Sequence, residues 1–264
     1  MDDFTYTPPA AGKASLKDRI LGMDKKLLAI IGGAAALLLV VIILIAVFAG
    51  GGSKTSPLSL MEKYVNRENV RYEDYLNDYT GKLVGSKAVK IVKILRSNED
   101  FAEYFENIEE SFAGRYEDRC DEYGEDFKIR YKNDRDSEDE IDEDDLDDYK
   151  DMLKELGKSY VELSKELSKM KNSEKKDLAE ELDISLRDLN KIIDCMKDIG
   201  TELKGAKVTE GYELNYDITI TGSELDEPEE DNGTMNVYKI NGKWCSGATY
   251  SALYTFYNVL CYFY

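Results

Sequence analysis

The side chains that could do chemistry in this sequence are almost all carboxylates, because it holds 54 Asp and Glu residues and no histidine. The absence of histidine excludes Ser-His-Asp triads, Cys-His dyads, His-ligated zinc and histidine general bases. Two carboxylates at a suitable separation can still hydrolyse a glycosidic bond. Since no acidic pair stands out by its spacing, we expect a protein without catalytic residues or cofactor, and glycan hydrolysis is the alternative.

The densest run of carboxylates, residues 133–148, invites comparison with a Ca²⁺-binding loop. An EF-hand loop starting at Asp134 would place Asp139 at position 6, which needs glycine, and Asp145 at position 12, where a longer glutamate is usual. We therefore expect a solvated segment whose acids precede a helix and complement its macrodipole. Weak, roughly millimolar Ca²⁺ binding is the alternative.

The four cysteines are the other chemically distinctive residues: Cys120, Cys195, Cys245 and Cys261. No CxxC spacing occurs, so the sequence predicts no metal or redox motif. Buried thiols or one structural bridge are the simplest interpretation, and three pairings are open. Cys245–Cys261 is the first pair to test, because it would fasten the C-terminal segment to the hairpin before it.

An apolar segment at residues 27–49 organises the rest of the chain. It holds only Leu, Ile, Val, Ala, Phe and Gly, and about 20 such residues cross a bilayer as a helix. Positive charge before it exceeds that in the matching distance beyond it, which predicts a cytoplasmic N-terminus. A cleaved signal peptide would have a shorter apolar region. We therefore predict a disordered tail (1–26), one transmembrane helix, a linker (50–55) and an extracytoplasmic domain (56–264).

The net charge of the chain limits its partners. At −19 it is strongly acidic, and most of the acids follow the apolar segment. Nucleic acids and anionic lipid headgroups need basic patches, so neither is expected to bind the domain. We expect contact with the bilayer through residues 27–49 alone, and an unidentified envelope protein or glycan as the partner.

Apolar residues at helical spacing dominate the domain. They predict three helices by their starts, at Ser56, near Ser86 and near Ser97. They predict three more by their extent, Tyr72–Gly81, 143–171 and 174–203, and the last of these has a break near Asp183.

Strands are predicted where the apolar period changes to two, at Phe127–Tyr131 and Tyr212–Thr221. Met235–Cys245 is typical of a β-hairpin, because Asn241-Gly242 favours a type I′ turn in which both central residues have positive φ. The order of these elements predicts an α+β fold, with helices packed on a small antiparallel sheet.

Several segments leave alternatives open. The polar stretch Glu224–Gly233 predicts an acidic loop, and the aromatic residues 250–264 fit a helix and, in part, a strand, with the helix favoured. Residues 178–196 resemble a helix-turn-helix, which would make the chain a membrane-tethered regulator of inverted topology. Five basic against eight acidic residues in 173–200 would repel DNA, so an amphipathic helical hairpin is the favoured interpretation.

Four features together resemble membrane-anchored bacterial proteins with NTF2-like or cystatin-like ectodomains: the anchor helix, the Gly/Ser linker, the Ser-Pro start of the first helix, and a closing hairpin. The hairpin reads Val237-Tyr238-Lys239-Ile240-Asn241-Gly242-Lys243-Trp244. In that family a curved antiparallel sheet cradles a helix, and a K-x-x-G-x-W hairpin is common near the end. The resemblance covers Ser56–Lys132 and Ala206–Ser246, and the helical insertion at 143–203 is longer than the family pattern.

The resemblance implies a binding or interaction module that faces the cell envelope, and it implies a fold more than an activity. Trp244, Tyr238 and Tyr216 could line a ligand or partner surface. At strand spacing, aromatic residues more often belong to a core. The resulting hypothesis is a single-pass membrane protein with a non-enzymatic binding or scaffolding domain.

Overall fold

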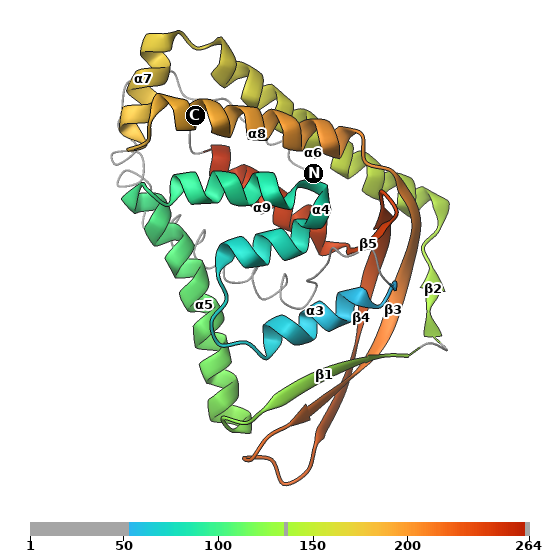
Figure 1. Cartoon of the computed structure of the whole chain (residues 1–264). Coiled ribbons are helices and arrows are strands. Elements are labelled where there is room, and N and C mark those ends of the chain that lie inside the picture. The colour runs from blue at the N-terminus through green and yellow to red at the C-terminus, as the bar shows by residue number, and fades with distance from the viewer. Residues whose placement is uncertain (1–52, 135–136, 262–264) are drawn as a thin grey trace, which may run out of the picture.

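The structure, a computed structural model, describes residues 53–134 and 137–261 (Figure 1). Helices pack on a curled antiparallel sheet, so the predicted α+β class is confirmed. No helix within these residues is both long enough and apolar enough to cross a bilayer. The predicted transmembrane segment 27–49 and the tail 1–26 lie outside them.

The helices cover most of the described chain. They are α3 (Ser56–Val65), α4 (Tyr72–Leu95), α5 (Glu99–Tyr123), α6 (Glu143–Lys169), α7 (Asn172–Glu181), α8 (Leu186–Lys204) and α9 (Ala248–Cys261). The strands are β1 (Lys128–Asn133), β2 (Asp139–Glu140), β3 (Val208–Thr221), β4 (Glu229–Ile240) and β5 (Lys243–Ser246).

The sheet is built around the long strand β3. Its order is β1-β3-β4-β5, all antiparallel, and the short β2 pairs with β3 beside β1. The β4–β5 turn has positive φ at both central residues, 51° at Asn241 and 79° at Gly242. This is the type I′ geometry that the sequence predicted, and it matches the twist of the paired strands.

Helices α6 and α8 form the largest helix–helix contact of the molecule and cross at two glycines. A Cβ built on Gly157 of α6 would lie 2.7 Å from the carbonyl oxygen of Gly200 in α8, and a Cβ on Gly200 would lie 2.5 Å from the carbonyl oxygen of Gly157. Only glycine allows two backbones to approach this closely. The helical insertion is therefore fastened by direct backbone contact.

The free long edge of β1 is covered by α3. The Asn66 side chain accepts a hydrogen bond from the backbone N–H of Ile129 (2.8 Å) and donates one to its carbonyl oxygen (2.7 Å). The Glu62 carboxylate accepts from the N–H of Tyr131 at 3.4 Å. Side chains thus take the place of a neighbouring strand, which protects this edge from pairing with another chain.

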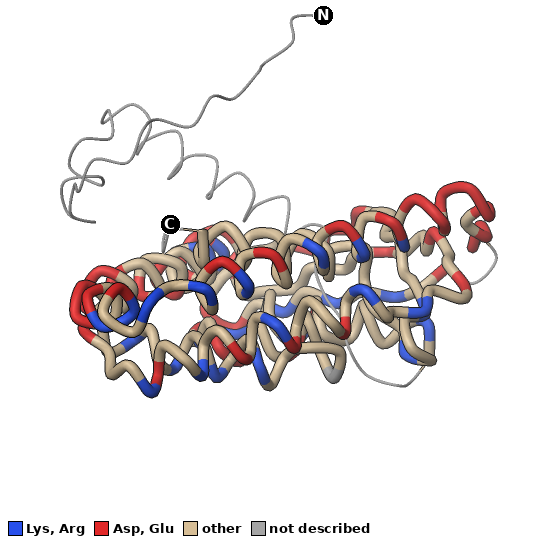
Figure 2. Tube along the Cα trace, turned by 90° about the horizontal axis from the view of Figure 1, so that it is seen from above, with Lys and Arg blue, Asp and Glu red and all other residues tan. Residues whose placement is uncertain are grey.

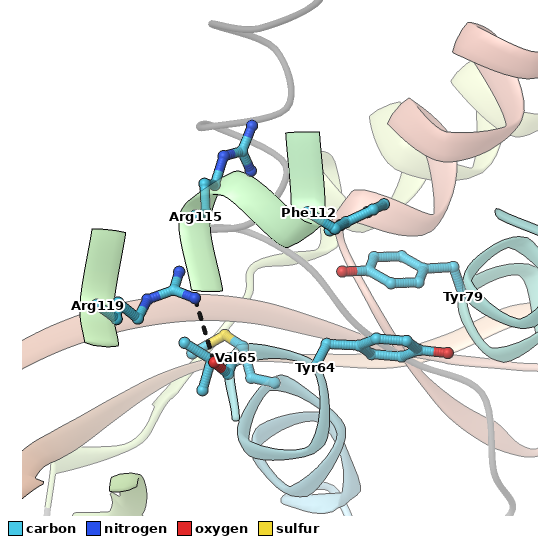
Figure 3. Close-up of a pocket in the computed structure, with 7 residues that line it drawn as sticks. Tyr64, Val65, Tyr79, Phe112, Arg115 and Arg119 are labelled. Atoms are coloured by element: carbon cyan, nitrogen blue, oxygen red, sulfur yellow. Dashed lines mark hydrogen bonds between the residues drawn. The ribbon is translucent and has the colours of Figure 1, made fainter. Parts of the chain in front are cut away.

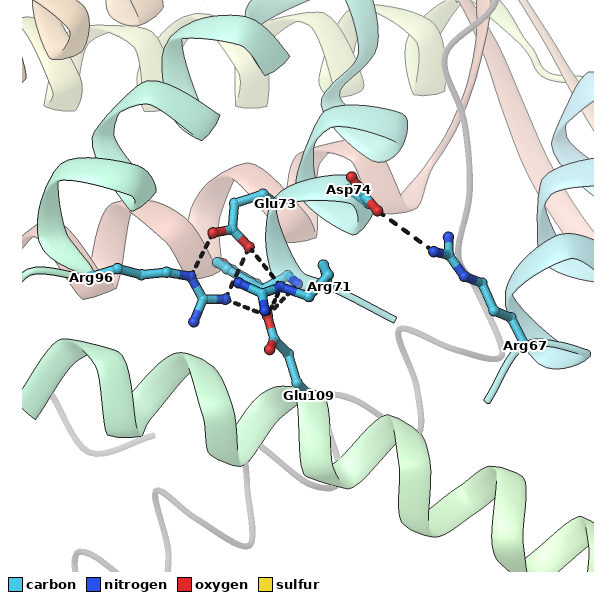
Figure 4. A network of polar contacts seen from close by, with 7 residues as sticks. Arg67, Arg71, Glu73, Asp74, Arg96 and Glu109 are labelled. Carbon is cyan, nitrogen blue, oxygen red and sulfur yellow. Dashed lines mark hydrogen bonds and ion pairs between the residues drawn. The ribbon is translucent and has the colours of Figure 1, made fainter. Parts of the chain in front are cut away.

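A network of ion pairs fixes the two ends of α4 against α5 (Figure 4). Arg96 donates to both carboxylate oxygens of Glu73, at 2.5 and 2.9 Å, and also pairs with Glu109. Glu109 accepts a further bond from the backbone N–H of Tyr72 at 2.8 Å. The side chains of Arg96, Glu73 and Glu109 are only 11–16% exposed, so solvent screens these charges weakly.

Several local predictions need correction. The predicted interruption at Gly81 is present, as a non-helical kink with φ of 50° and ψ of −150°, but the second helical piece resumes directly after it and not near Ser86, and it ends at Leu95. The cap of α5 is Asn98, whose side chain accepts from the N–H of Phe101 (3.1 Å), instead of Ser97. The acidic loop predicted at Glu224–Gly233 is shorter than expected, because β4 already begins at Glu229.

Candidate functional site

The aromatic residues suggested as a partner surface belong to the core. Tyr216, Tyr238 and Trp244 are 5%, 7% and 8% exposed. The Tyr238 ring stacks on Tyr149 with 3.8 Å between centroids, and Tyr216 meets Tyr131 edge-on. Packing accounts for all three, and they do not form an exposed surface.

The cysteines are free thiols, so the Cys245–Cys261 bridge is not formed. Cys245 is buried in β5, whereas Cys261 is exposed at the last residue of α9. The 14 residues of α9 extend about 20 Å, so they carry Cys261 well away from the strand. Disulfide formation needs Cα atoms within about 7 Å.

The described part of the acidic run forms a strand and a helix cap. Asp139 and Glu140 make β2, and Asp142 caps α6 by accepting from the N–H of Asp145 at 2.9 Å. Within 53–134 and 137–261, no group of three or more His, Cys, Asp or Glu side chains is placed to hold a metal ion. Figure 2 shows acidic residues gathered at the end of the molecule where α6 begins. The macrodipole of α6 is favourable to them.

The segment that resembles a helix-turn-helix folds as two helices, α7 and α8, joined at Asp183, which has a positive φ of 49°. Ser185 caps α8 by accepting from the N–H of Asp188 at 3.1 Å. The Asn190 amide donates to the carbonyl of Leu186. Lys191 pairs with Asp188 at 2.6 Å. The arrangement is that of an amphipathic helical hairpin packed on α6.

A small cavity between α3, α4 and α5 brings together the most unusual side chains of the fold (Figure 3). Its volume open to water is about 20 Å³, which is room for roughly one water-sized group. Its lining is aromatic and basic: Met61, Tyr64, Val65, Tyr79, Phe112, Arg115 and Arg119. In a chain of net charge −19, an enclosed space lined by two arginines and no carboxylate is exceptional.

The two arginines lie one turn apart on α5 and are both half-buried. Burial lowers the pKa of Arg115 below its usual value, and the neighbouring Arg119 charge lowers it further. Burial likewise lowers the pKa of Arg119. Both guanidinium groups stay charged at physiological pH, because an arginine is not deprotonated in proteins. Two like charges are therefore held close together in a partly dehydrated space.

Each arginine also has a structural role that must be weighed against ligand binding. Arg119 donates from Nη1 to the Val65 carbonyl at the end of α3 (3.1 Å), which is a favourable position for a cation. The methylene groups of Arg115 can cover the aromatic ring of Phe112 while the charge stays near water.

The tyrosines around the cavity are neutral hydrogen-bond donors. Burial raises the pKa of Tyr79 and of Tyr75 well above their usual value. Figure 3 shows the Tyr79 hydroxyl directed toward the part of α5 that carries Arg115 and Arg119. The Tyr75 hydroxyl is buried, and its pKa responds to the Tyr79 hydroxyl beside it and to the charge of Arg115. Tyr64 already donates to Asp78 at 2.7 Å.

Taken together, guanidinium groups and tyrosine hydroxyls suit an anion. A carboxylate oxygen entering the cavity could accept charge-assisted hydrogen bonds from Arg115 and a neutral one from Tyr79. The small volume admits only the acidic end of a ligand, so the rest of that ligand would lie outside. Phe112 belongs to the buried apolar side of α5, and the two arginines follow it by three and seven residues. A pair of arginines one turn apart beside that apolar side was the available signal.

Glycoside hydrolysis requires two carboxylates in a cleft that also holds a sugar. The arginine cavity has aromatic walls but no carboxylate. A more open depression on the sheet is lined by Asp217, Glu230 and Asp231 but by no aromatic residue. Neither place combines the two requirements.

Comparison with known proteins gives no relative from which a function could be transferred. No protein-family model matches the sequence, and no curated protein or solved structure matches it significantly. The resemblance to NTF2-like or cystatin-like ectodomains therefore stays a prediction.

Proposed function

We propose that the chain is a membrane-anchored, non-enzymatic binding module whose folded part recognises an anionic group of its ligand between Arg115 and Tyr79. The observation that supports this most strongly is the pair of half-buried arginines in the aromatic cavity of an otherwise acidic protein. Holding two like charges in a partly dehydrated site costs free energy. A bound carboxylate would offset that cost.

The cavity proposal predicts that small carboxylates bind at Arg115. Acetate, added to the full-length chain in detergent at constant ionic strength, should shift the NMR signal of the Arg115 side-chain Nε–H and raise the melting temperature. The Arg115→Gln variant should bind acetate at least tenfold more weakly, because a hydrogen bond to a charged group contributes about 1.5–3 kcal/mol.

Arg187→Gln is the matched control, because Arg187 is exposed at the start of α8, far along the chain from the cavity. It should bind acetate like the unmodified chain. Equal acetate affinity in the Arg115 and Arg187 variants would refute the proposal and leave Arg115 with a packing role only. Chloride at the same concentration tests whether any anion is sufficient.

The proposed location has its own experiment. Residues 27–49 supply the apolar length for one bilayer crossing, and the flanking charges favour a cytoplasmic N-terminus. In a chain whose accessible native thiols are removed by Cys120→Ser and Cys261→Ser, a cysteine introduced at the exposed Ser223 should react with a membrane-impermeant maleimide in intact cells, whereas one introduced at Ser15 should react only after permeabilisation. The opposite pattern would place the folded part in the cytoplasm.

A further inference from the structure

Strand β4 has one edge that is only partly paired. One edge of β4 pairs with β3 over most of the length of β4. Its second edge pairs with β5 only at Val237–Ile240. The preceding part, Glu229–Asn236, extends beyond β5, and within the described chain the sheet assigns it no second strand neighbour. At the bottom of Figure 1 the β3–β4 hairpin projects past α3.

The direction of the backbone groups on this edge follows from one hydrogen bond. The carbonyl of Asn236 accepts from the N–H of Gly247 at 2.8 Å, on the side away from β3. Because these directions alternate along an antiparallel strand, the backbone groups of Thr234, Asn232 and Glu230 point to the same outer side. The N–H of Asn232 indeed bonds to the side chain of Asp231 and not to β3.

This edge contrasts with the opposite edge of the sheet. There, Asn66 and Glu62 occupy the backbone groups of β1. On β4, four successive residues from Glu229 to Asn232 are exposed, as are Thr234 and Asn236. A strand edge of this kind can accept an extended peptide as an additional strand.

The charge of the hairpin selects the kind of peptide. Between Lys207 and Lys239 the chain carries nine acidic residues and neither lysine nor arginine. Three of the acids are at the edge itself: Glu229, Glu230 and Asp231. The nearest basic strand is β1, whose backbone lies beyond β3 and so about 10 Å from β4, although its Lys132 side chain lines the same surface depression as Glu230 and Asp231. The edge therefore has a local negative potential of its own.

We infer that the Glu229–Asn236 edge of β4 binds an extended, lysine- or arginine-rich segment of another protein by strand addition. Backbone hydrogen bonds to Glu230, Asn232 and Thr234 would give the affinity, and the acids would select basic side chains. A second copy of this chain is a poorer occupant, because pairing two such edges brings two acidic hairpins together, and like charges across strands destabilise pairing. The inference is independent of the arginine cavity.

The test uses the full-length chain in detergent and a fluorescent peptide of alternating lysine and valine. Saturable binding that weakens with salt is expected. A peptide of alternating glutamate and valine should not bind. Asn232→Pro removes an outward N–H without breaking a bond to β3, and proline is tolerated on such an edge. It should weaken binding at least tenfold.

A triple variant, Glu229→Gln, Glu230→Gln and Asp231→Asn, keeps the backbone edge intact and should also weaken binding at least tenfold. The matched control neutralises three exposed acids of α6, Asp144→Asn, Asp148→Asn and Glu162→Gln, and should bind within about twofold of the unmodified chain. If Asn232→Pro fails to fold, as judged by circular dichroism, the triple variant decides the question.

Three results would overturn the inference. The first is equal peptide affinity in the triple variant and its control. The second is full affinity in a folded Asn232→Pro variant, because binding would then need charge but no strand edge. The third is a dimer in light scattering that Asn232→Pro dissolves, which would assign the edge to a second copy of the chain.

Discussion

Replacing Gly157 with alanine should lower the free energy of unfolding by about 3 kcal/mol, the upper end of what overpacking costs. The added Cβ would lie 2.7 Å from the carbonyl oxygen of Gly200, and a backbone atom cannot move aside as a flexible side chain can. Helices α6 and α8 would have to separate along their whole contact. Urea-induced unfolding, followed by far-ultraviolet circular dichroism, measures the change.

Gly114→Ala is the matched control, because it also places alanine in the interior of a long helix. A Cβ at Gly114 of α5 meets nothing within 4 Å. The substitution should therefore stabilise the protein by about 0.5–1 kcal/mol through the better helix propensity of alanine. If both variants shift stability in the same direction, the close approach of α6 and α8 does not exist in solution.

Replacing Arg96 with methionine should destabilise the protein by about 3–5 kcal/mol at neutral pH, as expected when one partner of a buried ion network is removed. Glu73 and Glu109 would be left close together and shielded from water, with only the more exposed Arg71 nearby. Chemical unfolding at pH 7 gives the magnitude.

The pH dependence of this variant separates lost charge pairing from lost packing. Burial tends to raise the pKa of Glu73, but the hydrogen bonds and charge of Arg96 outweigh it and hold the pKa below its usual value. A lowered pKa stabilises the folded state above the unfolded pKa of about 4.3, and this contribution disappears as pH falls through the folded pKa. In the variant Glu73 loses the charge of Arg96 and is repelled by the Glu109 carboxylate, so the pKa of Glu73 should rise. The difference in stability should therefore shrink between pH 7 and pH 4.

Arg67→Gln is the control for the ion network, because Arg67 pairs with Asp74 at 3.7 Å on the open surface (Figure 4). An exposed pair contributes at most about 1 kcal/mol. A loss as large as that of Arg96→Met would mean that general charge balance, and not the buried network, controls stability.

Much of the fold follows from local sequence periodicity. The change from helical to strand spacing located β3, the Asn241-Gly242 pair located the β4–β5 turn, and the break near Asp183 separated α7 from α8. The C-terminal aromatic segment, for which a helix was favoured, forms α9. These features depend on a residue and its near neighbours, so one sequence is enough to predict them.

Features that depend on distant segments could not be predicted in this way. The cavity needs α3, α4 and α5 together, and no spacing within α5 reveals that Arg115 and Tyr79 are neighbours. Gly81 interrupts α4 as the sequence predicted, but the second helical piece resumes directly after it and not near Ser86, a start that local spacing did not locate. The predicted disulfide between Cys245 and Cys261 is wrong, because the residues between them form helix α9, which separates two cysteines that are near in sequence.

The bond between Asn66 and β1 has a mechanical consequence. Because α3 is the first element of the described chain, tension entering at Ser53 reaches the rest of the molecule through this helix. The helix cannot leave the sheet without breaking the two hydrogen bonds that join the Asn66 amide to Ile129. Pulling is thereby passed to β1 and to its neighbour β3, so the sheet resists as a unit and the first helix is not peeled away alone.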